Sequence, residues 1–175
     1  MTVAPRIPIA TNSAPGGRLG RRPPSIANGS GRAKKIWISD PTWANHASIF
    51  QAGGLETATY AYYDPKSHGL AEAAMLDSLA KVGAGDIVLL HTCCHNPSGV
   101  DPNLAQWKAI ADLAEKRGFL PLFDFAYQGF GDGIDEDAAP VRLFAERGLE
   151  LVIASSFSKN FGLYNERVGA LTLLA

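Results

Sequence analysis

Short apolar runs and helix-like stretches alternate along most of the chain, and this alternation restricts the folds that it can adopt. Strands are predicted at KIWIS (35–39), TATYAYYD (57–64), DIVLLH (86–91), FLPLFDFA (119–126), LELVIASS (149–156) and RVGALTLLA (167–175). Helices are predicted at 70–82, 101–118 and 139–148. This order of elements predicts a mainly parallel sheet with helices on both faces, which is a three-layer α/β/α fold.

The segment 101–118 gives the clearest helix signal. Pro102 suits the first turn of a helix, and Gly118 is a common residue at the point where a helix stops. We expect this helix to cross over between two parallel strands. The apolar residues that fall on one face at helical spacing are Leu104, Trp107, Ile110 or Ala111, and Ala114.

Residues 1–32 differ in composition from the rest of the chain. They are rich in Pro, Gly, Ser and Arg, contain no acidic residue, and show neither helical nor strand periodicity. We expect this segment to be irregular and disordered, and we hypothesise that it comes from a shifted reading frame or a wrongly assigned start. The nucleotide sequence upstream of the Lys34 codon tests this hypothesis, because another frame should then encode an amphipathic helix.

The charge balance and the cysteines limit the partners and the compartment. The 16 Lys and Arg residues against 17 Asp and Glu residues give a formal net charge of −1, which argues against nucleic acid as a partner. The sequence has no run of about 18 apolar residues that would span a membrane, and its N-terminus lacks the apolar region of a secretory signal. Cys93 and Cys94 are adjacent and cannot form a disulfide framework. These features predict a cytoplasmic protein.

Polar and aromatic side chains gather where the predicted strands end. In a parallel sheet, ligands bind at the carboxyl ends of the strands, so we expect these side chains to converge on one rim. They are Trp43, His46, Asn96, Asp124, Tyr127 and Lys159. Lys159 and Arg167 follow a buried strand, where a cation is costly unless an anionic or electrophilic group meets it.

Pyridoxal phosphate would satisfy this combination of residue types. A lysine amine forms a Schiff base with the aldehyde of this cofactor, and a carboxylate keeps the nitrogen of its pyridine ring protonated. Phenol and amide groups can hydrogen-bond the ring oxygen, while hydroxyls and an arginine bind the phosphate. Each of these residue types is present at or just after a predicted strand end.

Simpler roles are open for each of these residues taken alone. A lysine after a strand is usually a solvated loop residue, and Asp124 could cap a helix. Trp43 and Tyr127 could be ordinary core or rim aromatics, and Asn96 is typical of a turn. The case for a cofactor therefore depends on all of them lying together.

The segment HTCCH (91–95) raises a metal alternative, because histidine and cysteine are zinc ligands. Structural zinc sites normally separate their cysteines by about two to four residues, and adjacent cysteines at a strand end point in opposite directions. We therefore expect buried thiols and no metal. A Cys–His nucleophile pair has no orienting partner in the sequence. The acidic stretch 132–137 lacks the spacing of a calcium loop, so we expect a solvated helix start there.

Several segments resemble the signature sequences of one enzyme family. The three most specific are HNPSGVDP (95–102), DFAYQGFGDG (124–133) and SSFSKNFGLYNERVGAL (155–171). Two more are DPTWANH (40–46) and YAYYDPKSHGL (60–70). They resemble the class I pyridoxal-phosphate aminotransferases, in particular the aspartate and aromatic amino acid subgroup. The resemblance runs from about Lys34 to Ala175, and it implies that residues 33–175 are a partial large domain of a fold type I transferase, which binds the cofactor.

The resemblance implies a catalytic role for three residues. Lys159 would bind the cofactor covalently and move the proton at the α-carbon of the substrate. Asp124 would pair with the pyridinium nitrogen, with support from His46. Tyr127 would contact the ring oxygen and tune the pKa of the Schiff base.

The resemblance implies that the remaining residues hold the cofactor. Asn96 would also contact the ring oxygen, and Trp43 would stack on the face of the ring. The residues implied around the phosphate are Ser156, Ser158 and Arg167.

The resemblance also implies an activity, which is transamination between an amino acid, aspartate or aromatic, and a 2-oxo acid such as 2-oxoglutarate. Full-length members of the family are expected to be homodimers. The C-terminal small domain, with its substrate-binding arginine, is expected to be absent from this chain. Two alternatives stay open: a non-catalytic remnant of such an enzyme, and another reaction of the same cofactor such as β-elimination.

Overall fold

The computed structural model describes residues 35–175, so the prediction for residues 1–32 lies outside the described part of the chain. The strands are β1 (Lys35–Asp40), β2 (Glu56–Ala61), β3 (Tyr63–Asp64), β4 (Gly69–Leu70), β5 (Ile87–His91), β6 (Leu120–Phe125), β7 (Leu151–Ser156) and β8 (Gly169–Leu174). The helices are α1 (Asn45–Ala52), α2 (Glu72–Leu79), α3 (Leu104–Arg117) and α4 (Ala139–Glu146). Each strand and helix predicted from the sequence has a counterpart in the structure.

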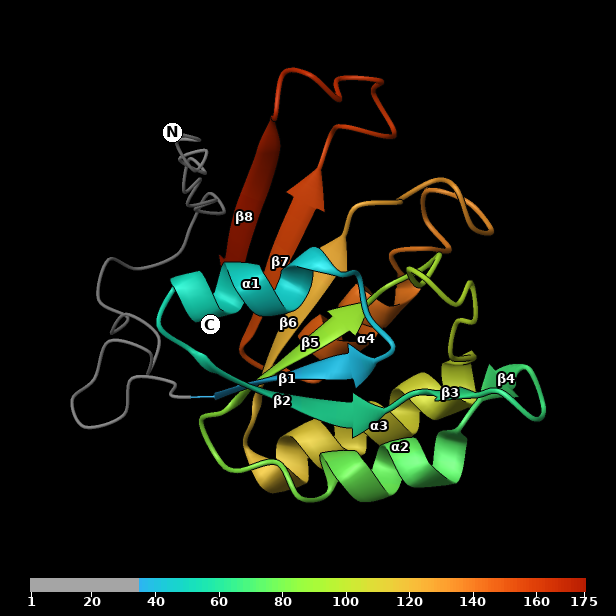
Figure 1. Ribbon diagram of the computed structural model, residues 1–175, viewed down its shortest axis with the longest axis vertical. Helices are drawn as coiled ribbons and strands as arrows, with labels where there is room; N and C mark the ends of the chain where they lie inside the picture. Colours follow the sequence, from blue (N-terminus) through green and yellow to red (C-terminus); the bar gives the residue numbers. More distant parts are fainter. Residues whose placement is uncertain (1–34) are drawn as a thin grey trace.

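Six strands form one sheet in the order β2-β1-β5-β6-β7-β8 (Figure 1). Neighbouring strands are parallel from β2 to β7, and β8 runs antiparallel to β7. The register pairs His91, the last residue of β5, with Asp124 of β6, and it pairs Phe125 of β6 with Ser155 of β7. The carboxyl ends of these three strands therefore lie side by side, and the predicted mainly parallel sheet is confirmed.

Helices cover both faces of the sheet, and β1 contributes side chains to both. On one face, α2, α3 and α4 surround a core that includes Trp107 and Phe144. On the other face, α1 packs over Ile36 and Ile38, whereas Trp37 points into the larger core. This alternation is the two-residue period of a strand, and the predicted three-layer arrangement is confirmed (Figure 1). None of the helices in residues 35–175 is both long and apolar enough to cross a membrane.

The start of α3 differs from the sequence-based expectation. Asn103 is the N-cap, because its side chain accepts a hydrogen bond from the Gln106 backbone N–H while the Gln106 side chain accepts one from the Asn103 N–H. This reciprocal capping pair sets the helix start at Leu104, so the prediction that Pro102 lies in the first turn is wrong. Leu104 was also expected on the buried face, but it is 55 % exposed. Gly118 ends the helix with a φ of 70°, as predicted.

Two features near the sheet are not predicted from the sequence, the helix α1 and the hairpin formed by β3 and β4. The predicted strand 57–64 divides at Tyr62, after which β3 pairs with β4 in a separate two-stranded sheet. The side chain of Tyr62 is buried, and its hydroxyl donates to the carbonyl of Val100 at 2.7 Å. A contact distant in sequence therefore decides where the strand breaks.

Asp137 ties down the loop that precedes α4. Its side chain is only 5 % exposed, and its carboxylate accepts hydrogen bonds from the backbone N–H groups of Gly129, Gly131 and Asp132 at 2.8, 3.0 and 2.9 Å. Burial raises the pKa of Asp137, but these hydrogen bonds outweigh burial and hold the pKa below its usual range. The expectation that 132–137 is a solvated helix start is therefore wrong at Asp137.

Replacing Asp137 with alanine is expected to lower the free energy of unfolding by about 2–4 kcal/mol, because three backbone donors lose a charged acceptor. Urea unfolding followed by circular dichroism measures this loss. Asp135→Ala is the matched control, since the side chain of Asp135 is 77 % exposed and its partner is the half-exposed Arg142. That control should cost less than about 1 kcal/mol, and equal losses for the two variants would contradict the assignment.

Candidate functional site

A cavity of about 380 Å³ lies at the carboxyl ends of β5, β6 and β7. All the predicted site residues except His46 line this cavity, and His46 contacts Asp124 from the interior of the protein. The predicted convergence of strand ends on one rim is therefore present in the structure. The lining residues are Trp43, His91, Asn96, Asp124, Ala126, Tyr127, Ser156, Ser158, Lys159, Tyr164 and Arg167.

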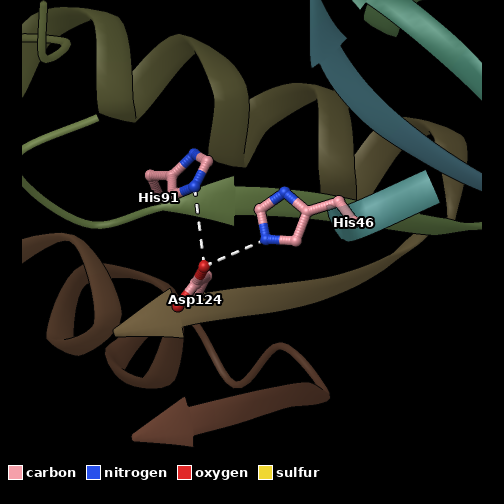
Figure 2. A group of neighbouring side chains, drawn as sticks. All are labelled: His46, His91 and Asp124. Atoms are coloured by element: carbon pink, nitrogen blue, oxygen red, sulfur yellow. Dashed lines mark hydrogen bonds and ion pairs between the residues drawn. The ribbon is translucent and has the colours of Figure 1, made fainter. Parts of the chain in front are cut away.

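Asp124 accepts a hydrogen bond from His46 in the wall of this cavity (Figure 2). The distance from Nε2 of His46 to Oδ2 of Asp124 is 3.1 Å, and the Thr42 hydroxyl lies 2.8 Å from Nδ1 of the same ring. An ionised carboxylate can only accept, so Nε2 carries the proton and, in the neutral ring, Nδ1 accepts from Thr42. His46 is 4 % exposed, and this chain of contacts fixes the orientation of the carboxylate.

His91 approaches the same carboxylate oxygen from β5 (Figure 2). Its Nε2 lies 3.5 Å from Oδ2 of Asp124, which is within ion-pair distance, but the geometry does not make a hydrogen bond. Both ring nitrogens are buried and have no hydrogen-bond partner within residues 35–175. Burial is the main cause that lowers the pKa of His91 to about 4, although the charge of Asp124 opposes it. His91 is therefore neutral at physiological pH.

The surroundings of Asp124 keep it ionised. Burial raises the pKa of this carboxyl group, but the hydrogen bond from His46, with the charge of Lys159 adding to it, acts in the opposite direction and holds the pKa below its usual range. The carboxylate also keeps contact with the cavity, since its side chain is 23 % exposed. An ionised acid that faces a cavity can hold a proton on a nitrogen of a bound molecule.

Lys159 lies between two aromatic rings on the connection from β7 to β8. Its Nζ atom is 4.8 Å from the ring centroid of Tyr127 and 5.7 Å from that of Tyr164. Within residues 35–175, the ammonium group makes no ion pair or hydrogen bond, and these ring faces are its contacts. An amine held over rings at the mouth of a cavity is available to react with an electrophile.

Hydroxyl groups and a guanidinium group lie where β7 and β8 meet. The Ser158 N–H donates to the Ser156 hydroxyl at 3.3 Å, and both residues line the cavity. The antiparallel pairing of Ser156 with Gly169 brings Arg167 back beside them. A Cβ atom at Gly169 would lie 2.6 Å from the carbonyl oxygen of Ser155, so this close approach of the two strands requires glycine. The arrangement can bind an anion.

Trp43 and Asn96 line the cavity from the connections that follow β1 and β5. Trp43 is 37 % exposed and stands edge-on to His46, with ring centroids 5.2 Å apart. Asn96 is half-buried, and its side chain forms no hydrogen bond within residues 35–175. Its amide group is therefore free to contact a bound molecule.

The potential metal ligands of HTCCH do not come together in the described part of the chain. His91 forms a group with His46 and Asp124, whose ligand atoms all lie within 4.8 Å of one another, but neither cysteine of residues 35–175 belongs to such a group. The Cys93 thiol donates to the Tyr127 carbonyl at 3.4 Å, and burial raises its pKa. It is a buried thiol, as the sequence predicted, and not a thiolate.

Sequence reasoning did not assign three residues that the structure places at the site. Tyr164 lines the cavity and contacts Lys159, and Thr42 holds His46. The sequence predicts for His91 only the role of a possible metal ligand, although its place at the end of a buried strand beside Asp124 brings it to the same wall. The position of His91 at a strand end was the signal that could have found it, whereas the contacts of Thr42 and Tyr164 depend on the fold.

The sequence is similar to proteins of known activity along most of the described chain. The family model described as aminotransferase class I and II matches residues 28–175. The chain is 58 % identical over 142 residues to the aspartate aminotransferase of Salmonella typhi, a match that covers 81 % of this chain and 36 % of that protein. It is 53 % identical over 140 residues to the aromatic-amino-acid aminotransferase of Paracoccus denitrificans. The chain thus spans about 36 % of the length of these relatives.

Solved structures of similar proteins have the same fold. The aromatic-amino-acid aminotransferase of Burkholderia pseudomallei, determined with pyridoxal phosphate covalently bound, superposes with a TM-score of 0.80 and 50 % identity over 81 % of this chain and 35 % of that one. The aromatic amino acid aminotransferase of Burkholderia cenocepacia gives the same TM-score and identity. With the family model matching residues 28–175, the chain belongs to the class I and II aminotransferase family.

Proposed function

We propose that this chain carries the cofactor-binding part of an aminotransferase that uses pyridoxal phosphate to move an amino group from an amino acid to a 2-oxo acid. One observation carries the proposal. The amine of Lys159 and the ionised carboxylate of Asp124 line a single cavity, and the charge of Lys159 contributes to the lowered pKa of Asp124. The two groups that must act at opposite ends of the cofactor are therefore in the same cavity.

The residues of the cavity fit this cofactor. A volume of about 380 Å³ is within the range of small-molecule sites. Lys159 makes no ion pair within residues 35–175, and Asp124 accepts a hydrogen bond from His46. Hydroxyls and Arg167 lie at the β7–β8 end of the cavity, where a phosphate would meet them.

Each residue has a defined part in the proposed reaction. The bound cofactor supplies a ring that withdraws electrons from the substrate. Asp124 holds the proton on the ring nitrogen, and His46 keeps the carboxylate in place. Lys159 would hold the cofactor covalently, and its amine would remove and return the proton at the α-carbon of the substrate. Tyr127 and Asn96 contact the ring oxygen.

The remaining contacts hold the cofactor in place. Trp43 lines the cavity next to the His46 that orients Asp124, so its indole would contact the ring of the cofactor. Ser156, Ser158 and Arg167 bind the phosphate, with the guanidinium as the main charged contact.

The substrates and the assembly are part of the same proposal. We infer an aspartate or aromatic amino acid as the donor and a 2-oxo acid such as 2-oxoglutarate as the acceptor, on the strength of the two kinds of relative. We also infer a cytoplasmic homodimer for the full-length protein. Large apolar side chains next to the site support an interface there: Phe130, Phe161 and Tyr164 are 58 %, 69 % and 60 % exposed.

Reduction with borohydride in the presence of pyridoxal phosphate tests the proposal directly. The cofactor should be fixed to Lys159, and peptide mapping by mass spectrometry should find about one label per chain there. Labels spread over surface lysines would reject the site. Transfer of an amino group from aspartate to 2-oxoglutarate would then separate transamination from other reactions of the same cofactor, such as β-elimination, and from a remnant that only binds.

A further inference from the structure

We propose that His95 is a positioning residue that holds Asn96 at the wall of the cavity. It does this through Ser39 at the end of β1 and Ser98 in the turn after β5. The inference rests on the proposed function, because Asn96 matters here as a contact of the cofactor's ring oxygen.

Both nitrogens of the His95 ring are engaged. Nε2 lies 2.9 Å from the hydroxyl of Ser39, and Nδ1 lies 2.7 Å from the hydroxyl of Ser98. The ring is 1 % exposed. Burial and the neighbouring histidines lower the pKa of His95 to about 3, so the neutral ring donates from one nitrogen and accepts at the other. It thereby links two segments that are 56 residues apart in sequence.

The faces of the ring are also fixed. Tyr62 stacks on His95 with ring centroids 3.9 Å apart and an interplanar angle of 16°. His91 packs edge-on at 4.5 Å. The hydroxyl of Tyr62 donates to the carbonyl of Val100 at 2.7 Å, which is in the same turn. The imidazole therefore has little freedom to rotate or shift.

The backbone on either side of Asn96 is built around His95. The carboxylate of Asp101 accepts hydrogen bonds from the N–H groups of Cys94 and His95 at 2.6 and 2.9 Å. The carbonyl of His95 accepts from the Gly99 N–H at 2.7 Å. Asn96 follows His95 directly, and its own side chain has no hydrogen bond within residues 35–175. Its position is therefore set by the backbone that His95 holds.

A double-mutant cycle separates this role from a general loss of structure. An N–H donor at the ring oxygen stabilises negative charge there, so losing the donor should raise the pH midpoint of the visible absorption of bound pyridoxal phosphate. We expect Asn96→Ala to raise the midpoint by about one to two pH units, and His95→Gln to raise it by at least about half a unit. His95→Gln should cause no further shift of the midpoint when Asn96 is already alanine, because His95 acts through Asn96.

Two further variants make the outcome decisive. His68→Asn is the matched control, because His68 is exposed on the β3–β4 hairpin with a φ of 53° that asparagine tolerates, and it should leave the midpoint unchanged. Ser98→Ala removes only one contact of the ring and should shift the midpoint in the same direction, even where His95→Gln does not fold.

The inference is overturned if folded His95→Gln or Ser98→Ala has the same pH midpoint of cofactor absorption as the wild-type chain. It is also overturned if His95→Gln shifts that midpoint by the same amount when Asn96 is already alanine. Wild-type chain that takes up no cofactor would instead overturn the proposed function, and this inference with it.

Discussion

A chain in which Lys159 is replaced by alanine will retain no pyridoxal phosphate after borohydride reduction, whereas the wild-type chain will retain about one equivalent. Among the described residues that line the cavity, Lys159 is the only lysine, so no other amine of residues 35–175 is placed to replace it. Any transamination by the protein should also fall by at least about 10²- to 10⁴-fold, since the same amine moves the proton. Mass spectrometry of the reduced chain and the visible absorption of the mixture measure the first effect.

Lys81→Ala provides the matched control. Lys81 is exposed on the connection that precedes β5, whereas the cavity lies at the opposite end of that strand, so its loss should leave both the label and the absorption unchanged. Retention of a stoichiometric label by Lys159→Ala, at any other single position, would show that another lysine is the attachment point.

Acid will weaken the fold sharply at a pH where most proteins are still stable, because two buried histidines must stay neutral. The folded-state pKa values of His91 and His95 are lowered to about 4 and about 3, below the ordinary value of 6.5. Their contribution to stability is complete above about pH 6.5, declines as the pH falls between about 6.5 and the lowered values, and is fully lost below those values. In this window the unfolding free energy should drop by up to about 2.7 kcal/mol per pH unit, about 1.4 for each histidine.

Urea unfolding curves collected between about pH 7.5 and about pH 5 measure this slope. His91→Asn should reduce the slope by about half, because one of the two titrating groups is gone. His68→Asn should leave it unchanged, since that ring is exposed. If the unfolding free energy of the wild-type protein changes with pH by an amount that corresponds to the uptake of less than one proton on unfolding, the neutral state of these histidines is contradicted.

The sheet could be predicted because the central strands carry short apolar runs, with polar residues mainly toward their ends. The run 86–91 is such a strand, since β5 lies between β1 and β6 and is covered on both faces. The helix α1 could not be predicted in this way. It is short, lacks a side-chain cap, and contributes only Ala47 and Phe50 to the core, so its stability comes from packing against β1. The break at Tyr62 likewise depends on a hydrogen bond to a distant carbonyl.

The residues of the candidate site could be named from the sequence, but most of their contacts could not. Lys159 and Asp124 follow apolar runs, and their shared cavity agrees with the order of the strands. The contact between Ser39 and His95 joins residues that only the pairing of β1 with β5 brings together. No local pattern marks such a pair, because each residue alone is an ordinary buried polar group.

The hairpin of β7 and β8 has a consequence for how this protein can change over time. The connection between these strands carries Ser158, Lys159 and Arg167, whereas the opposing carboxylate belongs to β6. An insertion or deletion between Lys159 and Arg167 would change the distance from the amine to the guanidinium, while Ser156 stays in β7. A change in the length of this one loop could therefore fit the site to a longer or shorter ligand, without altering the strand β6 that carries the carboxylate.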